Sequence, residues 1–400
     1  MIDPTARCPN WLTDRIIDCG GSISFHKYMD LVLNDPKNGF YSTGSLRIGK
    51  DGDFCTSPSL GNDFARLLAI QVVDWLSDLE KAGIEYEVFS VVEMGPGEGT
   101  LSRDLIVAIS EIAPALISKI EFILVELNIG MRKRQEKVVG NLEGFNYRWS
   151  NIEDLILSPV TGVVIANEVL DAFPVERLVF TEKKVFRQGV SLKKVTDEYF
   201  LEFVDLSPTK EIMEFIKDSN SLLNIEFPPK DICGRWVTEW HCDVQIWFKK
   251  LSQILLNGTL LVVDYAIESK RYYSLIRKDG TLISYRNQKA NSNILKDPGL
   301  SDITAHLCVE STINYALNNG WKFIGETRQG QALLALGLSK FLHSLQNTSN
   351  QNLSAALNRR ESLLRLVDPM GLGEFRWLAF QRDNSDNLNF GSRFLEEPIS

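Results

Sequence analysis

The chain has 400 residues, of which 44% are hydrophobic and 24% are charged. That composition is ordinary for a globular protein, and the length suits two or three domains, or one α/β domain with large insertions. The formal net charge of -9 disfavours a nucleic-acid partner, because an acidic surface repels phosphate groups.

The six cysteines and four histidines form no metal-binding pattern, because they are scattered and no C-x-x-C occurs. We therefore expect no metal site, and thiols that stay reduced inside a cell. No window approaches eighteen uninterrupted apolar residues, so we expect no membrane span. The first eighteen residues carry Asp3, Asp14 and Asp18, which fits neither a secretory nor a mitochondrial targeting segment. These features predict a cytoplasmic protein.

A helical extension precedes the first core strand. Residues 22–33 carry apolar side chains at helical spacing, with Ser22 or Ser24 as the N-cap. Residues 60–79 form a second amphipathic pattern, and the polar stretch 50–59 before it has no regular pattern. We expect residues 1–84 to pack onto the domain that follows and to carry a loop that covers its cofactor.

Strand and helix patterns alternate after this extension, which predicts a mostly parallel α/β sheet. Ligands bind such sheets beyond the carboxyl ends of the strands. Polar residues fall at those ends, namely Glu93, Glu126, Asn151, Asn167, Glu168, Asp264 and Tyr265. The predicted strands are 88–93, 120–126, 145–149, 162–167 and 259–264, with helices near 100–110, 128–139 and 241–257.

Two insertions interrupt the predicted core of residues 85–382. Residues 175–235 alternate with period two, which indicates antiparallel strands, and residues 266–309 are polar and rich in turns. The last segment, 383–400, has the composition of a disordered tail. Two hairpin strands close the core at 321–327 and 375–380, with helices at 331–345 and 353–366 between them.

A glycine-rich turn joins the first core strand to the next helix. Gly95, Gly97 and Gly99 alternate along the turn, and Thr100 opens the helix. Free backbone N–H groups therefore face a ligand at close range. A dinucleotide site would need the spacing G-x-G-x-x-G, which this turn lacks because its third glycine comes one residue early.

Two acids distinguish this turn from a dinucleotide site. Glu93 precedes the glycines and Glu126 ends the second strand, whereas Lys119 stands where a dinucleotide site would carry its ribose-binding acid. This is the pattern of S-adenosylmethionine-dependent methyltransferases, in which Glu126 would bind both ribose hydroxyls. The alternative is an ordinary strand-to-helix turn without a ligand.

The fourth predicted strand ends in the run Asn167-Glu168, followed by Asp171. Paired carboxylates suit a guanidinium group, because its planar donors match carboxylate oxygens and its charge needs compensation when it is desolvated. Alternatively, Asp171 only caps the turn that follows the strand.

With these motifs, residues 20–382 resemble the MidA-like family of S-adenosylmethionine-dependent methyltransferases, which includes the mitochondrial complex I assembly-factor arginine methyltransferases. The most specific runs are N-E-x-x-D-A-x-P at 167–174 and D-I-T-A-H at 302–306. The resemblance also rests on the runs 36–41, 52–58, 93–101, 280–286, 298–301 and 370–371, and on Glu126.

The resemblance implies a class I, Rossmann-like methyltransferase with a mostly parallel seven-stranded sheet and an inserted antiparallel β/helical subdomain. It implies methylation of an arginine on a respiratory NADH dehydrogenase subunit. The implied catalytic residues are Asn167, Glu168, Asp171 and His306. The implied S-adenosylmethionine-binding residues are Gly52, Asp53, Thr56, Ser57, Glu93, Gly95, Pro96, Gly97, Gly99, Thr100, Glu126, Asn151 and Asn167.

Other readings stay open from the sequence. The chain could methylate a small molecule, or act as an assembly scaffold that needs no turnover. His306 could accept a proton on the substrate side or anchor its loop. The helices predicted at 60–79 and 331–345 could supply the face of a homodimer.

Overall fold

The structure is a computed structural model that describes residues 6–43, 49, 56–84, 86, 88–140, 142, 144–345, 353–384 and 388–398. The chain divides into two compact units. The insert unit takes the described residues of 1–46, 170–246 and 266–315, and the core unit takes those of 47–169, 247–265 and 316–400. The domain boundaries predicted from the sequence at residues 84 and 382 stay a prediction.

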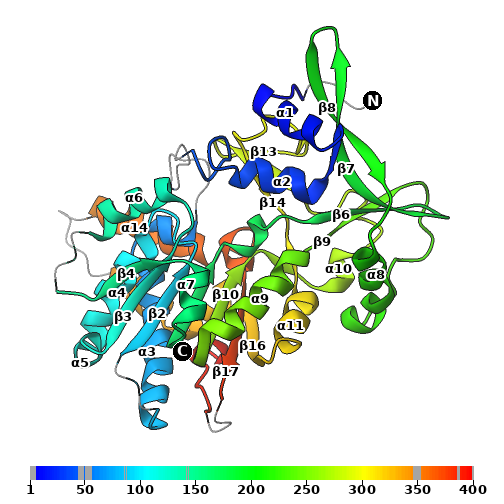
Figure 1. Ribbon diagram of the computed structural model, residues 1–400. Coiled ribbons are helices and arrows are strands. Elements are labelled where there is room, and N and C mark those ends of the chain that lie inside the picture. Colours follow the sequence, from blue (N-terminus) through cyan, green and yellow to red (C-terminus); the bar gives the residue numbers. More distant parts are fainter. Residues whose placement is uncertain are drawn as a thin grey trace. The chain divides into compact units, whose positions relative to one another are not determined.

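A mixed sheet of seven strands forms the centre of the core unit, in the order β16-β17-β10-β5-β2-β3-β4 (Figure 1). Only β17 is antiparallel to its neighbours, so the other strands all run in one direction. The seven-stranded α/β sheet is therefore as predicted. The strands are β2 (Phe89–Met94), β3 (Ile120–Val125), β4 (Tyr147–Ser150), β5 (Val160–Asn167), β10 (Leu255–Asp264), β16 (Lys322–Arg328) and β17 (Arg376–Arg382).

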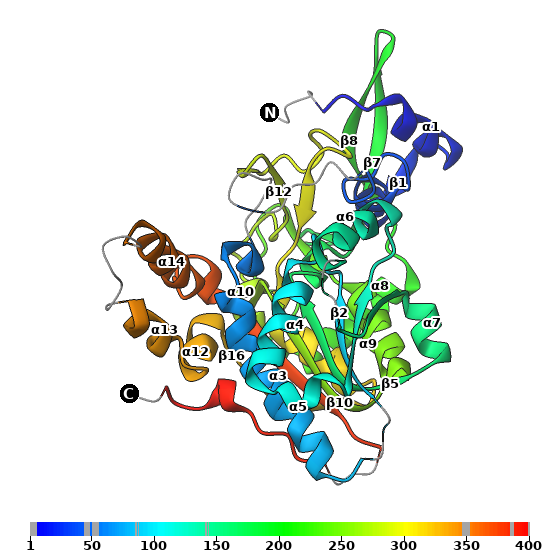
Figure 2. The same cartoon turned by 90° about the vertical axis from the view of Figure 1, so that its left-hand side faces the viewer.

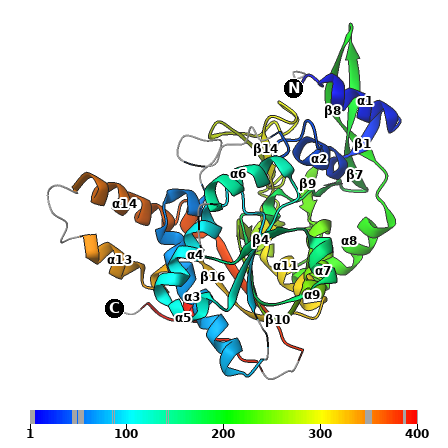
Figure 3. The same ribbon diagram turned by 60° about the vertical axis from the view of Figure 1, so that its left-hand side comes forward.

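Helices cover both faces of this sheet, because its central strands are apolar on both sides. All six residues of β2 are buried, as expected for a parallel strand between two helical layers. Helices α3 (Asp63–Lys81) and α4 (Thr100–Ile112) lie on one face, and α7 (Ile152–Leu157) lies on the other (Figure 3). The remaining described helices of the core unit before β5 are α5 (Pro114–Ile117), α6 (Ile129–Val139) and the 3-10 helix Ser57–Leu60.

Among the described residues, three further helices lie between the closing strands β16 and β17: the helix predicted at 353–366 is present, and the one predicted at 331–345 is divided into two. Figure 2 shows α12 (Gln329–Ala335), α13 (Leu338–Ser344) and α14 (Leu353–Leu366) on the side of α3. The 3-10 helices Leu372–Glu374 and Arg393–Leu395 flank β17.

The prediction of a disordered tail from residue 383 is wrong for residues 388–398, which pack within the core unit. Phe394 is buried in the core cluster and packs edge-on against Trp75 at 6.1 Å between ring centroids. Arg393 forms an ion pair with Asp74 on α3, at 2.7 Å between Nε and Oδ2. Two buried aromatic side chains, Phe390 and Phe394, and one charge pair therefore hold a segment whose polar composition alone suggests disorder.

The insert unit contains a separate antiparallel sheet in the order β1-β7-β6-β9, with β8 paired to β7 in a long hairpin (Figure 1). Its other strands form a pair and a three-stranded sheet. The strands are β1 (Ser22–Ser24), β6 (Glu176–Phe180), β7 (Val185–Val195), β8 (Glu198–Leu206), β9 (Trp236–Trp240), β11 (Ala266–Ile267), β12 (Ile283–Arg286), β13 (Lys289–Asn291), β14 (Asp302–Thr304) and β15 (Leu307–Cys308).

The N-terminal segment differs from the predicted extension, because its first part belongs to the insert unit. Ser22–Ser24 form strand β1, which pairs with β7, and the predicted helix starts only after them, with Ser24 as its N-cap. The helices of this unit are α1 (Asn10–Asp18), α2 (Phe25–Asn34), α8 (Lys210–Leu223), α10 (Ser269–Tyr272) and the 3-10 helix Leu170–Ala172. Along the chain, α9 (Cys242–Ile254) and α11 (Val309–Leu317) begin in the insert unit and end in the core unit.

Among the described residues, every helix is too short or too polar to cross a bilayer.

The close approach of β2, β5 and β10 depends on Gly162. Its φ is +151°, and a Cβ there would lie 1.9 Å from the carbonyl oxygen of Ser90. We expect Gly162→Ala to lower the free energy of unfolding by about 3 kcal/mol or more, since the strands must separate and the backbone is strained. Chemical denaturation measures this change.

Gly144→Ala is the matched control, because its φ is +83° but nothing lies within 4 Å of the added Cβ. It should cost only about 1–2 kcal/mol, the price of the left-handed backbone. Equal losses in the two variants would contradict the claim that strand contact at Gly162 limits the sheet.

Candidate functional site

Polar side chains gather where the parallel strands of the core unit end. Glu93 lies at the end of β2, Glu126 follows β3, and Asn167 ends β5. Neighbouring parallel strands deliver their carboxyl ends to the same edge of a sheet. Backbone contacts hold this edge together, because Glu168 N donates to Val263 O at 2.8 Å. The predicted convergence of strand ends within the core unit is therefore present.

The glycine turn after β2 uses the left-handed backbone region three times. The φ angles are +61° at Gly95, +51° at Gly97 and +81° at Gly99, which glycine adopts without steric cost. A Cβ at Gly95 would lie 3.1 Å from Cγ2 of Val169, so the turn packs closely against the segment after β5. Gly99 is the N-cap of α4, which begins at Thr100.

Glu93 is buried and accepts a hydrogen bond from the hydroxyl of Ser102 in the first turn of α4. Burial raises the pKa of Glu93 to about 7, and the Ser102 contacts oppose that rise. A positively charged ligand group beside the turn would favour the ionised carboxylate again. The residue therefore suits the ammonium and sulfonium charges of S-adenosylmethionine.

Glu126 is held by a network that includes a residue the sequence did not point to. Its Oε1 accepts from Asn128 N at 2.8 Å, and its Oε2 accepts from Gln135 Nε2 at 2.9 Å. Gln135 is fully buried; it also donates to Gly97 O at 2.9 Å and accepts from Trp149 Nε1 at 2.9 Å. Since a carboxylate has about four acceptor positions, Glu126 keeps acceptor capacity for a ribose hydroxyl.

Asn151, predicted as a cofactor ligand, uses its side chain to cap its own helix. Its Oδ1 accepts from Asp154 N and its Nδ2 donates to Asp154 Oδ2, both at 2.8 Å. Thr56 is the N-cap of the 3-10 helix Ser57–Leu60. Gly52 and Asp53 lie outside the described residues.

Glu168 lies at the centre of the contacts beyond β5. Its backbone is left-handed, with a φ of +56°, a strained conformation that is common at functional sites. Its Oε1 accepts from Ser57 N and from Asn167 Nδ2, both at 3.1 Å. Burial, with a smaller contribution from Asp264, raises the pKa of Glu168 to about 8.

Asn167 carries a buried acceptor for which the described residues offer no donor. Its Oδ1 has no hydrogen-bond partner there, while its Nδ2 is used by Glu168. Buried polar atoms are nearly always paired, so an unpaired acceptor requires an explanation. An N–H group of a ligand would supply the missing bond, and the residues at these strand ends therefore fit a cationic ligand rich in donors.

Asp171 and His306 both belong to the insert unit. Asp171 is buried, and its carbonyl oxygen accepts from Ala305 N at 2.9 Å. His306 N donates to Thr281 Oγ1 at 3.1 Å. Strands β12 and β14 pair, so the two motifs 280–286 and 302–306 form one structure to which Asp171 is bonded.

The imidazole of His306 is neutral at pH 7. Burial, together with the charges of Arg277 and Arg271, lowers its pKa to about 4. A group with that pKa is a weak proton acceptor near neutral pH.

Sequence reasoning missed three residues that position the others, namely Ser102, Gln135 and Gln329. Gln329 is fully buried, and its Nε2 donates to Ser57 Oγ at 3.0 Å. Ser102 and Gln135 occur at helical positions whose spacing gives no sign of an inward polar contact. Gln329 is 272 residues from Ser57, so no local pattern could connect them.

These features define an α/β enzyme of the Rossmann-like class, with a glycine turn and carboxylates at successive strand ends. Residues 67–327 match the family model described as "Putative S-adenosyl-L-methionine-dependent methyltransferase". The match covers more than half of the chain, so the chain belongs to this family of methyltransferases, as the sequence predicted. Its cofactor is accordingly S-adenosyl-L-methionine.

A solved structure is similar over nearly the whole chain. It is a likely methyl transferase from Burkholderia thailandensis bound to S-adenosyl-homocysteine, with 27% identity and a TM-score of 0.80; the match covers 98% of this chain and 95% of that one. The class I methyltransferase fold predicted from the sequence is supported by this likeness.

Curated relatives carry the name protein arginine methyltransferase NDUFAF7, mitochondrial. The Homo sapiens protein is 26% identical, over 90% of this chain and 81% of its own length. The Xenopus laevis protein is 26% identical over 71% of this chain, and the chain spans only 64% of that relative. The predicted cytoplasmic location is contradicted by these relatives, which are named as mitochondrial proteins.

The raised pKa of Glu93 predicts a pH-dependent stability. Since the folded value is about 7 and the ordinary value is 4.5, its contribution to stability is complete below pH 4.5 and is lost as the pH rises through 7. Between these limits, the free energy of unfolding of the ligand-free protein should fall by about 3 kcal/mol relative to Glu93→Gln, at 1.36 kcal/mol per pKa unit.

Denaturation of both proteins at pH 4 and pH 8 measures this difference. Glu361→Gln changes an exposed carboxylate on α14 and should leave the pH profile of the wild type unaltered. If the Glu93→Gln curve keeps a constant offset from the wild type, then Glu93 is ionised throughout and the argument from burial is wrong.

Proposed function

We propose that this methyltransferase transfers a methyl group to an arginine side chain of a protein, namely a respiratory NADH dehydrogenase subunit during assembly of that complex. Two findings support the proposal. Curated relatives at about a quarter identity are named protein arginine methyltransferases. In addition, Asn167 Oδ1 is buried, has no donor among the residues that the structure describes, and stands beside the Glu168 carboxyl group, a combination suited to a guanidinium.

We assign the cofactor to the glycine turn and the carboxylates around it. Glu93 faces the charged amino-acid portion, Glu126 binds the ribose hydroxyls, and the turn approaches the cofactor with its backbone. The contribution of Asn151 is indirect, through the N-cap of α7. The full proposed set is Gly52, Asp53, Thr56, Ser57, Glu93, Gly95, Pro96, Gly97, Gly99, Thr100, Glu126, Asn151 and Asn167.

Asn167, Glu168 and Asp171 are proposed to hold and orient the guanidinium. Bound S-adenosyl-L-methionine would supply the methyl group as an electrophile on a positively charged sulfur. The residues then need only align the attacking nitrogen with that group and exclude water. A guanidinium beside Glu168 would lower the raised pKa of this carboxyl group, since an opposite charge favours the ionised form. Hydrogen bonding to the carboxylate would localise charge away from the attacking nitrogen.

The role of His306 and the oligomeric state are the least constrained parts of the proposal. The backbone bond of His306 to Thr281 favours anchoring of its loop, and the alternative role for His306 is proton acceptance after transfer. The apolar faces of α3 and α12 pack into the core of their own unit, so these helices give no support to the homodimer considered from the sequence.

The test is methyl transfer by Glu168→Gln. Wild type and variant are incubated with tritium-labelled cofactor and with NADH dehydrogenase subunits isolated from cells that lack this protein, and the label is traced to methylarginine. The amide cannot carry the negative charge, so turnover should fall at least about 100-fold, while calorimetry shows cofactor affinity within about threefold. The exposed Glu361→Gln should behave as wild type.

Three outcomes would contradict the assignment. Wild-type turnover in Glu168→Gln removes the role of this carboxylate. Label in a small molecule instead of a protein favours a small-molecule methyltransferase. Assembly of the respiratory complex in cells that carry only Glu168→Gln favours a scaffold that requires no methyl transfer.

A further inference from the structure

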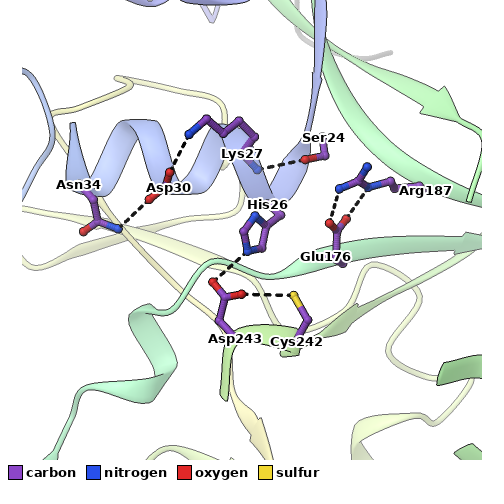
Figure 4. Close-up of polar contacts among 9 residues, drawn as sticks. All are labelled: Ser24, His26, Lys27, Asp30, Asn34, Glu176, Arg187, Cys242 and Asp243. Carbon is purple, nitrogen blue, oxygen red and sulfur yellow. Dashed lines mark hydrogen bonds and ion pairs between the residues drawn. The ribbon is translucent and has the colours of Figure 1, made fainter. Parts of the chain in front are cut away.

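A second polar cluster lies in the insert unit, among residues that the methyltransferase site does not use. His26 lies in the first turn of α2, and Cys242 and Asp243 are the first two residues of α9. Figure 4 shows the imidazole and the thiol directed toward the same carboxylate. One ligand atom from each of the three side chains lies within 4.8 Å of the others.

The three side chains share Asp243. His26 Nε2 lies 2.9 Å from Asp243 Oδ2, and Cys242 Sγ lies 3.6 Å from Asp243 Oδ1. The carboxylate therefore lies between the thiol and the imidazole. A catalytic cysteine would need the imidazole in contact with its sulfur, so this order disfavours a nucleophile and a base.

These separations are close to those around a tetrahedral zinc ion. Metal–ligand distances of about 2.0–2.3 Å for nitrogen, oxygen and sulfur place neighbouring donor atoms about 3.3–3.6 Å apart. The separations of 2.9 Å to Asp243 Oδ2 and 3.6 Å to Asp243 Oδ1 are near that range, although they involve different carboxylate oxygens, and one ligand atom from each residue lies within 4.8 Å of the other two. Small rotations of the side chains would bring the three donors onto one ion without moving the helices.

We propose that His26, Cys242 and Asp243 bind a transition-metal dication of the zinc type in the insert unit. An imidazole, a thiolate and a carboxylate form a donor set that zinc accepts, and the thiolate selects against magnesium and calcium. On binding, the Cys242 thiol loses its proton to solvent as the metal–sulfur bond forms.

The neighbouring ion pair leaves the fourth ligand position to water. Arg187 occupies both carboxylate oxygens of Glu176, with 2.7 Å between its Nε and Oε2, so Glu176 is not the fourth ligand (Figure 4). The side chains of His26 and Asp243 are 26% and 32% exposed, which gives solvent access to the cluster. The ion would therefore be held by three protein ligands and one water molecule.

A metal here would join distant parts of the chain within the insert unit. His26 and Asp243 are 217 residues apart, so the spacing of histidines and cysteines in the sequence gave no sign of the site. A bound ion would fix α2 against the first turn of α9. Binding should therefore raise the melting temperature of the protein.

The experiment measures metal binding by the full-length protein after removal of metals with EDTA. Zinc is titrated in competition with a chromophoric chelator, and cobalt is added separately, because a cobalt–thiolate bond gives a charge-transfer absorption. We expect one equivalent of zinc, a cobalt–thiolate band and a higher melting temperature with zinc. His26→Gln, Cys242→Ser and Asp243→Asn should each weaken zinc binding more than about tenfold, the loss found even for outer partners of metal ligands.

Matched controls are Cys233→Ser, an exposed thiol, and His343→Gln, an exposed imidazole on α13. Both should bind zinc as the wild type does. A wild-type protein without stoichiometric zinc or without the cobalt–thiolate band overturns the proposal, whatever the variants do. Unchanged binding in the three cluster variants, or loss in the controls, overturns it as well. Melting curves in metal-free buffer show whether each variant is folded.

Discussion

The candidate site of this protein depends on the electrostatic cost of burying carboxyl groups at the ends of parallel strands. Burial raises the pKa of Glu93 to about 7 and that of Glu168 to about 8. Neither carboxyl group has a cationic side chain among its hydrogen-bond partners in the described part of the chain; the partners are a serine, an asparagine and backbone N–H groups. A cofactor with a sulfonium and an ammonium group supplies the positive charge that such a site lacks.

Several backbone features hold these carboxyl groups and the glycine turn in position. The left-handed glycines bring the turn after β2 close to Val169, and the left-handed Glu168 directs its carboxyl group to Ser57 N. Gln135 connects the glycine turn with Glu126 and Trp149. Because these contacts join successive strand ends, a change at one of them is transmitted to the geometry of the others.

The strands and their polar ends were predictable because each depends on a local pattern: apolar runs, glycine spacing and the acid that follows. Contacts between segments that lie far apart in the sequence were not predictable from such patterns. Strand β1 has only three residues and pairs with β7 far along the chain, so the local spacing of apolar residues predicts a helix there. The segment around Phe394 is polar on average, but the buried rings of Phe390 and Phe394 and the Arg393 ion pair order it. The cluster of His26, Cys242 and Asp243 likewise exists only after folding.

Calorimetric titration of the purified protein with S-adenosyl-L-methionine, and separately with NADH, tests the central claim most directly. The carboxylates at the strand ends favour a cationic ligand, and the turn lacks the spacing that binds a pyrophosphate. The account predicts micromolar binding of S-adenosyl-L-methionine, weakened by Glu126→Ala, and no binding of NADH. Binding of NADH with no binding of S-adenosyl-L-methionine would contradict the roles of Glu93 and Glu126.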